Sequence, residues 1–248
     1  MVIYRARDGV ALLFDDGPNP KLTPKILEVL HEKGVKANFF LIGMKAEQAP
    51  DVTKQIVEAG HEIGNHTYTH KRLADLFKLQ GKQAVINEVT RGRDAIASAS
   101  GLDVSQIVYL RPPYLSWNYD VAKVVEPLYG ENIVSSGLAI GDYDWGIDHN
   151  WDENNTAAIS THAKQIVDAW TEATENGTLL GFHDSSEHNL PGNKQYTKWM
   201  NRALPTLEAL PTIIDNLHAK GFKICKLSDM ELIKEQPRPG QNGSNLSK

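Results

Sequence analysis

The sequence predicts an α/β protein in which strands and helices alternate along the chain. Apolar runs of strand length are separated by segments with helical spacing, and several of these segments end at a glycine. No internal repeat interrupts this order, and 248 residues fit a single α/β barrel. Such alternation is typical of a parallel sheet with crossover helices, either open or closed into a barrel.

Short apolar runs identify the strands. The run at 10–14 is entirely apolar apart from its flanks, and the run at 35–42 stops at Gly43. The others are shorter, and each lies between turn residues and a helical segment. In chain order we expect seven strands, at residues 10–14, 35–42, 62–64, 107–110, 133–136, 178–182 and 222–225.

Helical spacing identifies the segments between the strands. The helix expected at 22–33 places Ile26, Leu27 and Leu30 on one face, and Gly34 ends it. A glycine after the last periodic residue also ends most of the later helices. These are expected at residues 46–59, 79–100, 117–128, 157–176 and 207–219.

Composition limits the class of protein. A content of 41% hydrophobic residues supports a core, and we assign residues 1–232 to one domain. Residues 233–248, rich in Pro, Gly, Asn and Ser, are predicted to be a linker-like or disordered tail. The net charge of −5, with acids and bases interspersed, argues against nucleic acid as a partner. The single cysteine, Cys225, lies in an apolar run and is expected to be a buried core thiol.

The ends of the chain bear on location. No secretory signal begins the sequence, and no apolar stretch is long enough to span a bilayer, so no membrane partner is expected. The first strand follows closely on Met1, and the tail resembles a linker. We therefore expect a module of a longer, secreted or cell-surface protein that carries further modules.

Two adjacent carboxylates, Asp15 and Asp16, follow the first strand and precede Gly17-Pro18. Neighbouring side chains at a strand end point in different directions, so one acid can bind a metal while the other handles a proton. The alternative is an ordinary turn, because Asp-Gly and Gly-Pro are common in turns.

Two histidines, His66 and His70, lie four residues apart after another strand. One helical turn would bring their side chains within about 5–6 Å at Cβ. Together with Asp16 they would suit zinc or a comparable divalent ion, with one position open for water. The alternative is a pair of polar surface histidines, which is what such a spacing more often means when it occurs alone.

Three further segments supply candidate site residues. Arg111 precedes Pro112-Pro113-Tyr114, whose rigid backbone would hold Arg111 and the Tyr114 amide in place, although a structural ion pair is the alternative. Asp144 and Trp145 place an acid beside an aromatic wall, and His183 ends a strand as a candidate general acid. All the candidates at strand ends should share one edge of the sheet.

The remaining histidines are weaker candidates. Those in or beside predicted helices and strands are expected to be structural or solvated, namely His31, His61, His162 and His218. His149 and His188 lie in expected rim loops, where they could contact substrate.

Taken together, these motifs resemble those of polysaccharide deacetylases of the NodB-homology type, carbohydrate esterase family four. The motifs that carry the resemblance are Phe14–Pro18, His66–His70, Arg111–Tyr114, Asp144-Trp145 and His183. The resemblance covers about residues 8 to 232 and implies a distorted (β/α) barrel, with seven strands expected here.

The resemblance also implies a role for each motif residue. It implies Asp15 as general base, His183 as general acid, and Asp16, His66 and His70 as metal ligands. It further implies that Arg111 orients the base and that the Tyr114 amide stabilises the oxyanion. Asp144 would tune His183, while Trp145, Pro113 and Gly181 would line the substrate pocket.

Some positions depart from the family pattern. Leu13 stands where Thr or Ser is common, and Leu115 replaces a small residue. Gly181 stands where a leucine usually lines the acetyl pocket, and the segment 146–156 looks longer than usual. These departures affect the expected fit of the substrate, whereas the catalytic set is complete.

The function expected from these residues is metal-dependent hydrolysis of acetyl groups from a polysaccharide or oligosaccharide, with Zn²⁺ or Co²⁺ as the cofactor. We expect O-acetylated xylan as the substrate, and the alternative is N-deacetylation of chitin oligosaccharides or peptidoglycan. From a different class, the chain could be a metal-containing glycan-binding module without turnover. Intact Asp15 and His183 argue against that, because binding alone needs neither.

Overall fold

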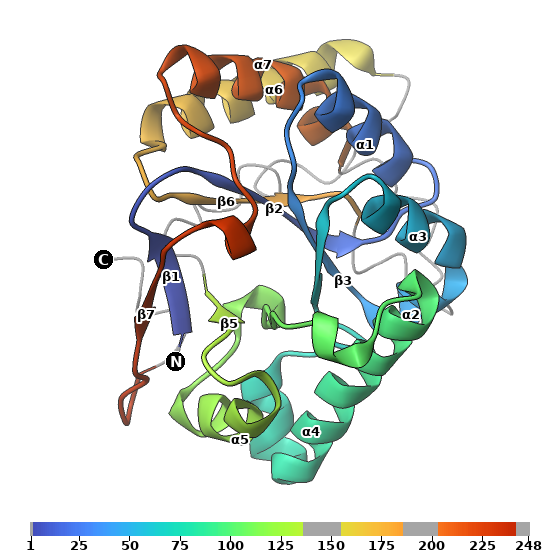
Figure 1. Ribbon diagram of the computed structural model, residues 1–248, viewed down its shortest axis with the longest axis vertical. Coiled ribbons are helices and arrows are strands. Elements are labelled where there is room, and N and C mark those ends of the chain that lie inside the picture. The colour runs from blue at the N-terminus through green and yellow to red at the C-terminus, as the bar shows by residue number, and fades with distance from the viewer. Residues whose placement is uncertain (1, 136–154, 186–202, 242–248) are drawn as a thin grey trace.

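The computed structural model describes residues 2–135, 155–185 and 203–241. In Figure 1 helices lie above, to the right of and below the central strands, while the strands at residues 2–6 and 232–235 lie at the left side of the view, where no helix covers them. The helices are α1 (Thr23–Glu32), α2 (Gly43–Gln48), α3 (Pro50–Glu58), α4 (Leu73–Ser100), α5 (Tyr119–Tyr129), α6 (Thr156–Ala173) and α7 (Ala203–Ala219). In this part of the chain, no helix has both the length and the apolar character needed to cross a bilayer.

Seven strands, in two sheets, are found among the described residues. They are β1 (Val2–Ala6), β2 (Ala11–Gly17), β3 (Asn38–Leu41), β4 (Glu62–Asn65), β5 (Ile133–Val134), β6 (Leu179–His183) and β7 (Leu232–Glu235). The four-stranded sheet has the order β4-β3-β2-β6 and is parallel throughout. In the three-stranded sheet β5-β1-β7, β1 runs parallel to β5 and antiparallel to β7.

Leu110 connects the two sheets. It forms parallel bridges with Asn65 at the end of β4 and with Ile133 in β5. The strands therefore follow one another around a curved wall, and no pairing of described residues joins β7 to β6. The predicted α/β class is confirmed, whereas closure of the wall into a distorted barrel stays a prediction.

The core beside β2 is built from stacked aromatic rings. The ring of Phe14 lies 5.0 Å from Phe39 of β3 and 5.4 Å from Phe182 of β6, and Trp170 of α6 packs on Phe182 at 5.4 Å. Strand alternation turns Phe182 towards this core, so its neighbours Gly181 and His183 face the other side of the sheet. Both faces of β2 are buried, which explains its almost uninterrupted apolar run.

Several predicted elements have different bounds in the structure. The helix predicted at 46–59 is two helices, α2 and α3, because Pro50 begins a new helix and cannot continue the previous one. The helix predicted from residue 79 begins six residues earlier, and Gly81 interrupts its helical backbone with φ of 78°. The strands predicted at 107–110 and 222–225 are reduced to isolated bridges.

Two strands, β1 and β7, were not expected. β7 pairs antiparallel with β1, although the linker-like tail was predicted to begin at residue 233. The backbone of Gln241 also accepts a hydrogen bond from the Tyr119 amide. Residues 233–235 thus pair in a sheet, although their composition alone suggests a linker.

His61 is a buried structural histidine. Its Nδ1 accepts a hydrogen bond from the Ala37 amide at 3.1 Å, and its ring contacts Phe39 edge-on. Burial, reinforced by the positive charges of Lys36 and Lys226, lowers the pKa of His61 to about 4.

The pH dependence of unfolding should report this shift. Between about pH 6.5 and 4 the unfolded chain binds a proton at His61 that the native state does not, so stability falls as the pH falls through this window. In His61→Asn, which keeps an acceptor for Ala37 but does not titrate, the loss should be smaller by about 1–3 kcal/mol. Denaturant unfolding at a series of pH values measures the difference, and parallel curves would contradict it.

Candidate metal centre and active site

The carboxyl ends of β2, β4 and β6 carry most of the predicted site residues. Asp15 and Asp16 lie at the end of β2, His66 follows β4, and His183 is the last residue of β6. The register of the parallel pair β2–β6 places Asp15 opposite His183. The expectation that these residues share one edge of the sheet is therefore confirmed.

The segment between His66 and His70 is a loop. It follows β4 directly, and Thr67 and His70 have left-handed backbone conformations, with φ of 68° and 60°. The prediction that one helical turn brings the two imidazoles together was therefore wrong about the backbone. The two side chains nevertheless meet, with Nε2 atoms 3.2 Å apart.

Buried polar contacts hold this loop in place. Asn65 accepts from the Thr67 amide and donates to the Val89 carbonyl of α4, at 2.8 Å each. Glu88 of α4 accepts from the backbone amide of Thr69 at 2.5 Å. Gly92 permits the close approach of α4, because a Cβ there would lie 2.6 Å from both Asn65 Oδ1 and the Thr67 carbonyl carbon.

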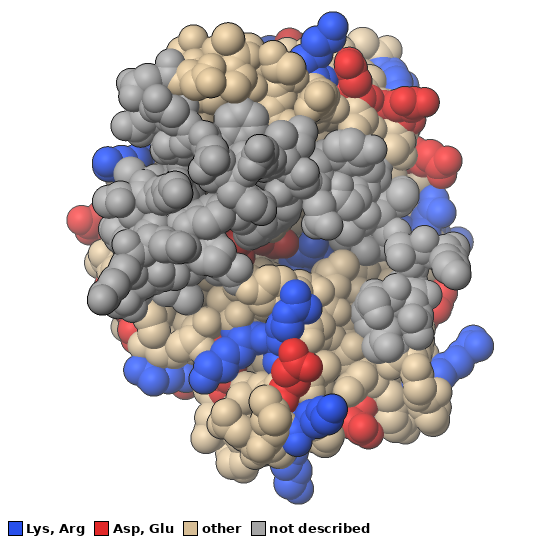
Figure 2. Space-filling model, turned by 180° about the vertical axis from the view of Figure 1, so that it is seen from behind, with Lys and Arg blue, Asp and Glu red and all other residues tan. Residues whose placement is uncertain are grey.

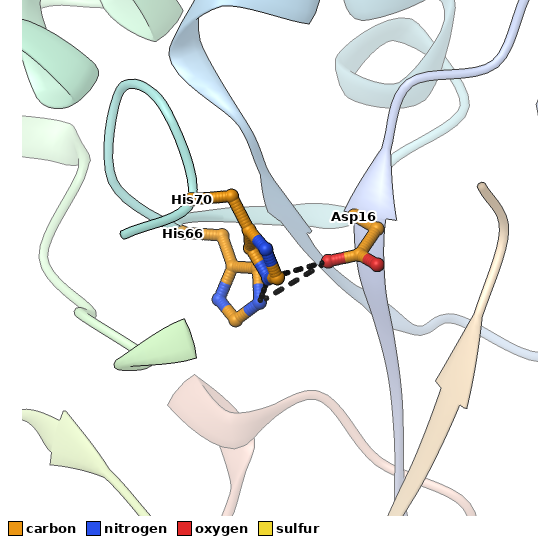
Figure 3. Close-up of side chains that lie close together, drawn as sticks. All are labelled: Asp16, His66 and His70. Atoms are coloured by element: carbon orange, nitrogen blue, oxygen red, sulfur yellow. Dashed lines mark hydrogen bonds and ion pairs between the residues drawn. The ribbon is translucent and has the colours of Figure 1, made fainter. Parts of the chain in front are cut away.

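Asp16, His66 and His70 converge on one point (Figure 3). Asp16 Oδ1 lies 2.9 Å from His70 Nε2 and 3.4 Å from His66 Nε2. One ligand atom from each residue lies within 4.8 Å of the others, and all three residues are buried. This is the spacing of a divalent metal site with two nitrogen donors and one oxygen donor.

The protonation of His66 suits a metal ligand. Its Nδ1 lies 2.7 Å from the carbonyl oxygen of Arg111. A carbonyl oxygen can only accept, so Nδ1 donates to it, and this hydrogen bond turns Nε2 towards the centre of the site.

Asp16 also fits a metal. Both of its carboxylate oxygens are buried, and among the described residues the polar side-chain atoms that face Oδ1 are the Nε2 atoms of His66 and His70. Burial by itself raises the pKa of Asp16, but His70, His66 and His183 together hold it well below its usual range. A buried carboxylate that stays ionised beside two imidazoles provides a cation site, so the donor set fits the divalent metal expected from the sequence.

Asp15 has a different partner. Arg111 Nε donates to Asp15 Oδ2 at 2.6 Å, and both side chains are almost completely buried. The other oxygen, Oδ1, is also buried, and no described residue donates a hydrogen bond to it. The two neighbouring carboxylates are therefore distinct, one held by a guanidinium and the other facing two imidazoles.

The Arg111–Tyr114 motif wraps the histidine side of the site. Tyr114 has a left-handed backbone, with φ of 56°, and its ring lies 4.7 Å from the His70 ring. The guanidinium of Arg72 lies 3.9 Å from the same ring, which remains 42% exposed. Pro113 is buried beneath the turn. The motif thus packs against His70 and leaves part of the Tyr114 ring accessible.

Gly181 faces this site. A Cβ on Gly181 would lie 3.3 Å from a terminal nitrogen of Arg111, and no other atom of the described residues would lie within 4 Å. The expected orientation of Gly181 and His183 away from Phe182 agrees with the packing of Phe182 in the core. The absence of a side chain at 181 leaves space beside the guanidinium that contacts Asp15.

The predicted residues Asp144 and Trp145, and the weaker candidates His149 and His188, lie outside the described residues.

His183 is partly exposed at the end of β6. On the face shown in Figure 2, acidic and basic side chains are visible below the surrounding surface, at the bottom of a hollow.

The sequence did not point to a buried polar group behind Asp16. Lys45 donates to the Asp16 carbonyl at 2.7 Å and to Ser185 Oγ at 2.8 Å, and Thr23 Oγ1 donates to Asp184 at 2.5 Å. Burial raises the pKa of Asp184 to about 7. The position of Asp184 next to His183 was the one signal in the sequence that could have indicated this group. Lys45 gave none, because a lysine is ordinarily expected to be exposed.

Metal titration should separate the two neighbouring acids. Asp16→Asn replaces an anionic ligand by a neutral amide. Zn²⁺ affinity should therefore fall by more than the roughly 10–100-fold that is typical when a residue hydrogen-bonded to a metal ligand is lost. Asp15→Asn leaves the three ligand atoms in place and should alter the affinity far less. Competition with a chromophoric chelator measures both, and equal losses would contradict the assignment.

Comparison with known proteins agrees with this geometry. Residues 4–129 match the model of the family described as polysaccharide deacetylase. A chitooligosaccharide deacetylase of Sinorhizobium fredii is 31% identical over 219 residues, which cover 88% of this chain and 89% of the relative. A bifunctional xylanase/deacetylase of Pseudobutyrivibrio xylanivorans is 28% identical over 89% of this chain, but only 30% of that protein is covered.

A solved structure shows the same fold. The crystal structure of the Bc1960 peptidoglycan N-acetylglucosamine deacetylase superposes with a TM-score of 0.69 at 28% identity, covering 92% of each chain. With its α/β wall and its Asp-His-His centre at the strand ends, this chain belongs to the polysaccharide deacetylase family of metal-dependent hydrolases.

Proposed function

We propose that this chain removes N-acetyl groups from a glycan containing N-acetylglucosamine, such as a chitin oligosaccharide or peptidoglycan. A relative and a solved structure that each match most of this chain are named for these two substrates. The expectation of O-acetylated xylan has support from the bifunctional xylanase/deacetylase, of which the match covers 30%. The two N-deacetylases are matched over most of their own length as well, so the N-acetyl alternative fits better.

The observation that carries the proposal is the different environment of Asp15 and Asp16. Asp16 faces the two imidazoles, which makes it a metal ligand. Asp15 is held through Oδ2 by Arg111, and its Oδ1 has no donor among the described residues. A carboxylate held in this way has one oxygen left to accept a proton, as a general base must.

The reaction that follows is hydrolysis of an amide. When bound by Asp16, His66 and His70, the metal would polarise the acetyl carbonyl and lower the pKa of water. Asp15 takes the proton of the attacking water, and the Arg111 guanidinium orients its carboxylate. The products are acetate and the free amine of the sugar.

Two residues on separate elements act on the oxyanion and on the leaving group. The Tyr114 amide is proposed to stabilise the oxyanion, which is supported by the position of the Tyr114 turn beside His70. His183, opposite Asp15 across the β2–β6 pair, protonates the leaving nitrogen. Asp144 is proposed to tune His183, and Trp145 to border the pocket, as the family motif implies.

Nitrogen and carboxylate donors in this ratio suit Zn²⁺ and also accept Co²⁺, and we propose one of these as the cofactor.

Acetate release tests the function directly. Zn²⁺-loaded enzyme should release acetate from N-acetylated chitooligosaccharides and peptidoglycan faster than from acetylated xylan, and chelation should abolish release. Asp15→Asn should keep its metal and lose about 10²–10⁴-fold in turnover, because an amide accepts no proton.

Three outcomes would contradict the proposal. Preference for xylan would restore the O-acetyl alternative. Full activity in chelated enzyme would exclude the metal. Metal binding and glycan binding without any acetate release, in the native chain as in Asp15→Asn, would show a binding module.

Gly181 gives a test of the acyl pocket. We propose that the space beside Arg111 admits acyl groups longer than acetyl. Gly181→Leu should therefore reduce propionyl hydrolysis more than acetyl hydrolysis, since a methylene is worth about 1–3 kcal/mol in such pockets. Gly181→Ala is the control, because it introduces the 3.3 Å contact with Arg111 without filling the pocket. An unchanged acetyl-to-propionyl ratio in Gly181→Leu would mean that Gly181 does not line the pocket.

A further inference from the structure

Lys45 of α2 is a buried lysine directly behind the metal centre. Only 4% of its surface is exposed, although lysine is among the residues least often buried. A buried ammonium group is costly to desolvate unless it is paired and hydrogen-bonded. Its position must therefore be explained by the groups that it contacts.

The Lys45 ammonium joins the end of β2 to the segment after β6. Nζ donates to the backbone carbonyl of Asp16 at 2.7 Å and to Ser185 Oγ at 2.8 Å. Asp184, fully buried next to Ser185, interacts electrostatically with Lys45 and accepts a hydrogen bond from Thr23.

The backbone at residues 16 and 17 is confined between these groups. Lys45 contacts the carbonyl of Asp16, and the Asp184 carboxylate packs so closely under Gly17 that a Cβ there would lie 2.4 Å from both of its oxygens. Asp16 itself is left-handed, with φ of 73°. Such a conformation costs free energy in a residue other than glycine and persists only where the surroundings enforce it.

We propose that Lys45 is a positioning residue for the metal centre. Its hydrogen bond to the Asp16 carbonyl stabilises the left-handed backbone, and that backbone aims the Asp16 carboxylate at His66 and His70. The inference rests on the metal centre within the proposed function and does not depend on which glycan is the substrate.

The rival explanation is that Lys45 only compensates the charge of Asp184. The two explanations predict opposite effects on metal binding. An ammonium near a cation site repels the cation, so its removal should tighten metal binding if charge alone matters. If Lys45 positions Asp16, its removal should weaken metal binding, because the carboxylate loses its fixed direction.

The test is Zn²⁺ affinity measured by chelator competition, below the melting temperature of each folded variant. Lys45→Met should weaken binding by about 10–100-fold, as is typical for the loss of a group that orients a ligand. Lys36→Met is the matched control, because Lys36 also donates to a backbone carbonyl, that of Ala59 at 2.6 Å, but on the surface. Its Zn²⁺ affinity should equal that of the native chain.

The double variant Lys45→Met/Asp184→Asn keeps the test decisive if Lys45→Met alone unfolds. It removes both charges and should recover stability, while Zn²⁺ affinity stays low because the Asp16 carbonyl still has no donor. Native or tighter affinity in either variant would overturn the proposal. Since the titration needs no substrate, a failure to release acetate would count against the proposed function and leave this result intact.

Discussion

The buried ion pair between Arg111 and Asp15 is the interaction on which the rest of the site depends. Arg111 donates through Nε to Asp15, its carbonyl accepts from His66 Nδ1, and its amide donates to the Asn65 carbonyl at 3.0 Å. One residue thus orients an acid at the end of β2 and the imidazole of His66, which follows β4. Leu110, which precedes it, bridges the two sheets, so the wall of the fold sets the position of Arg111.

The chemistry of the site could be predicted from the sequence because strand ends in a parallel sheet share an edge. Asp15, Asp16, His66 and His183 were expected there, and the structure places them there. The proximity of His66 and His70 was predicted from helical spacing, whereas a loop anchored by Asn65 and Glu88 produces it. Four-residue spacing is compatible with both conformations, and only tertiary contacts distinguish them.

Other features depend on long-range partners that local patterns do not encode. β7 is short and half polar, and only its pairing with β1 marks it as a strand. Lys45 follows an apolar run, but a lysine is ordinarily expected to be exposed, and the partners that explain its burial, Asp16 and Ser185, lie 29 and 140 residues away. The strand predicted at 222–225 also depends on a distant partner, and its pairing is limited to a bridge between Ile224 and Val10.

The close contact of Gly92 with the histidine loop has a consequence for protein engineering. This residue is on α4, offers no functional group, and lies more than twenty positions from the histidines, yet the loop occupies the volume that a methyl group would need. Gly43 in turn packs against Gly92, where a Cβ would meet its Cα at 2.8 Å. Transplanting only the chemically active side chains onto another scaffold would therefore not reproduce the centre. The graft must include these two glycines, because the empty space that they provide determines where the imidazoles can lie.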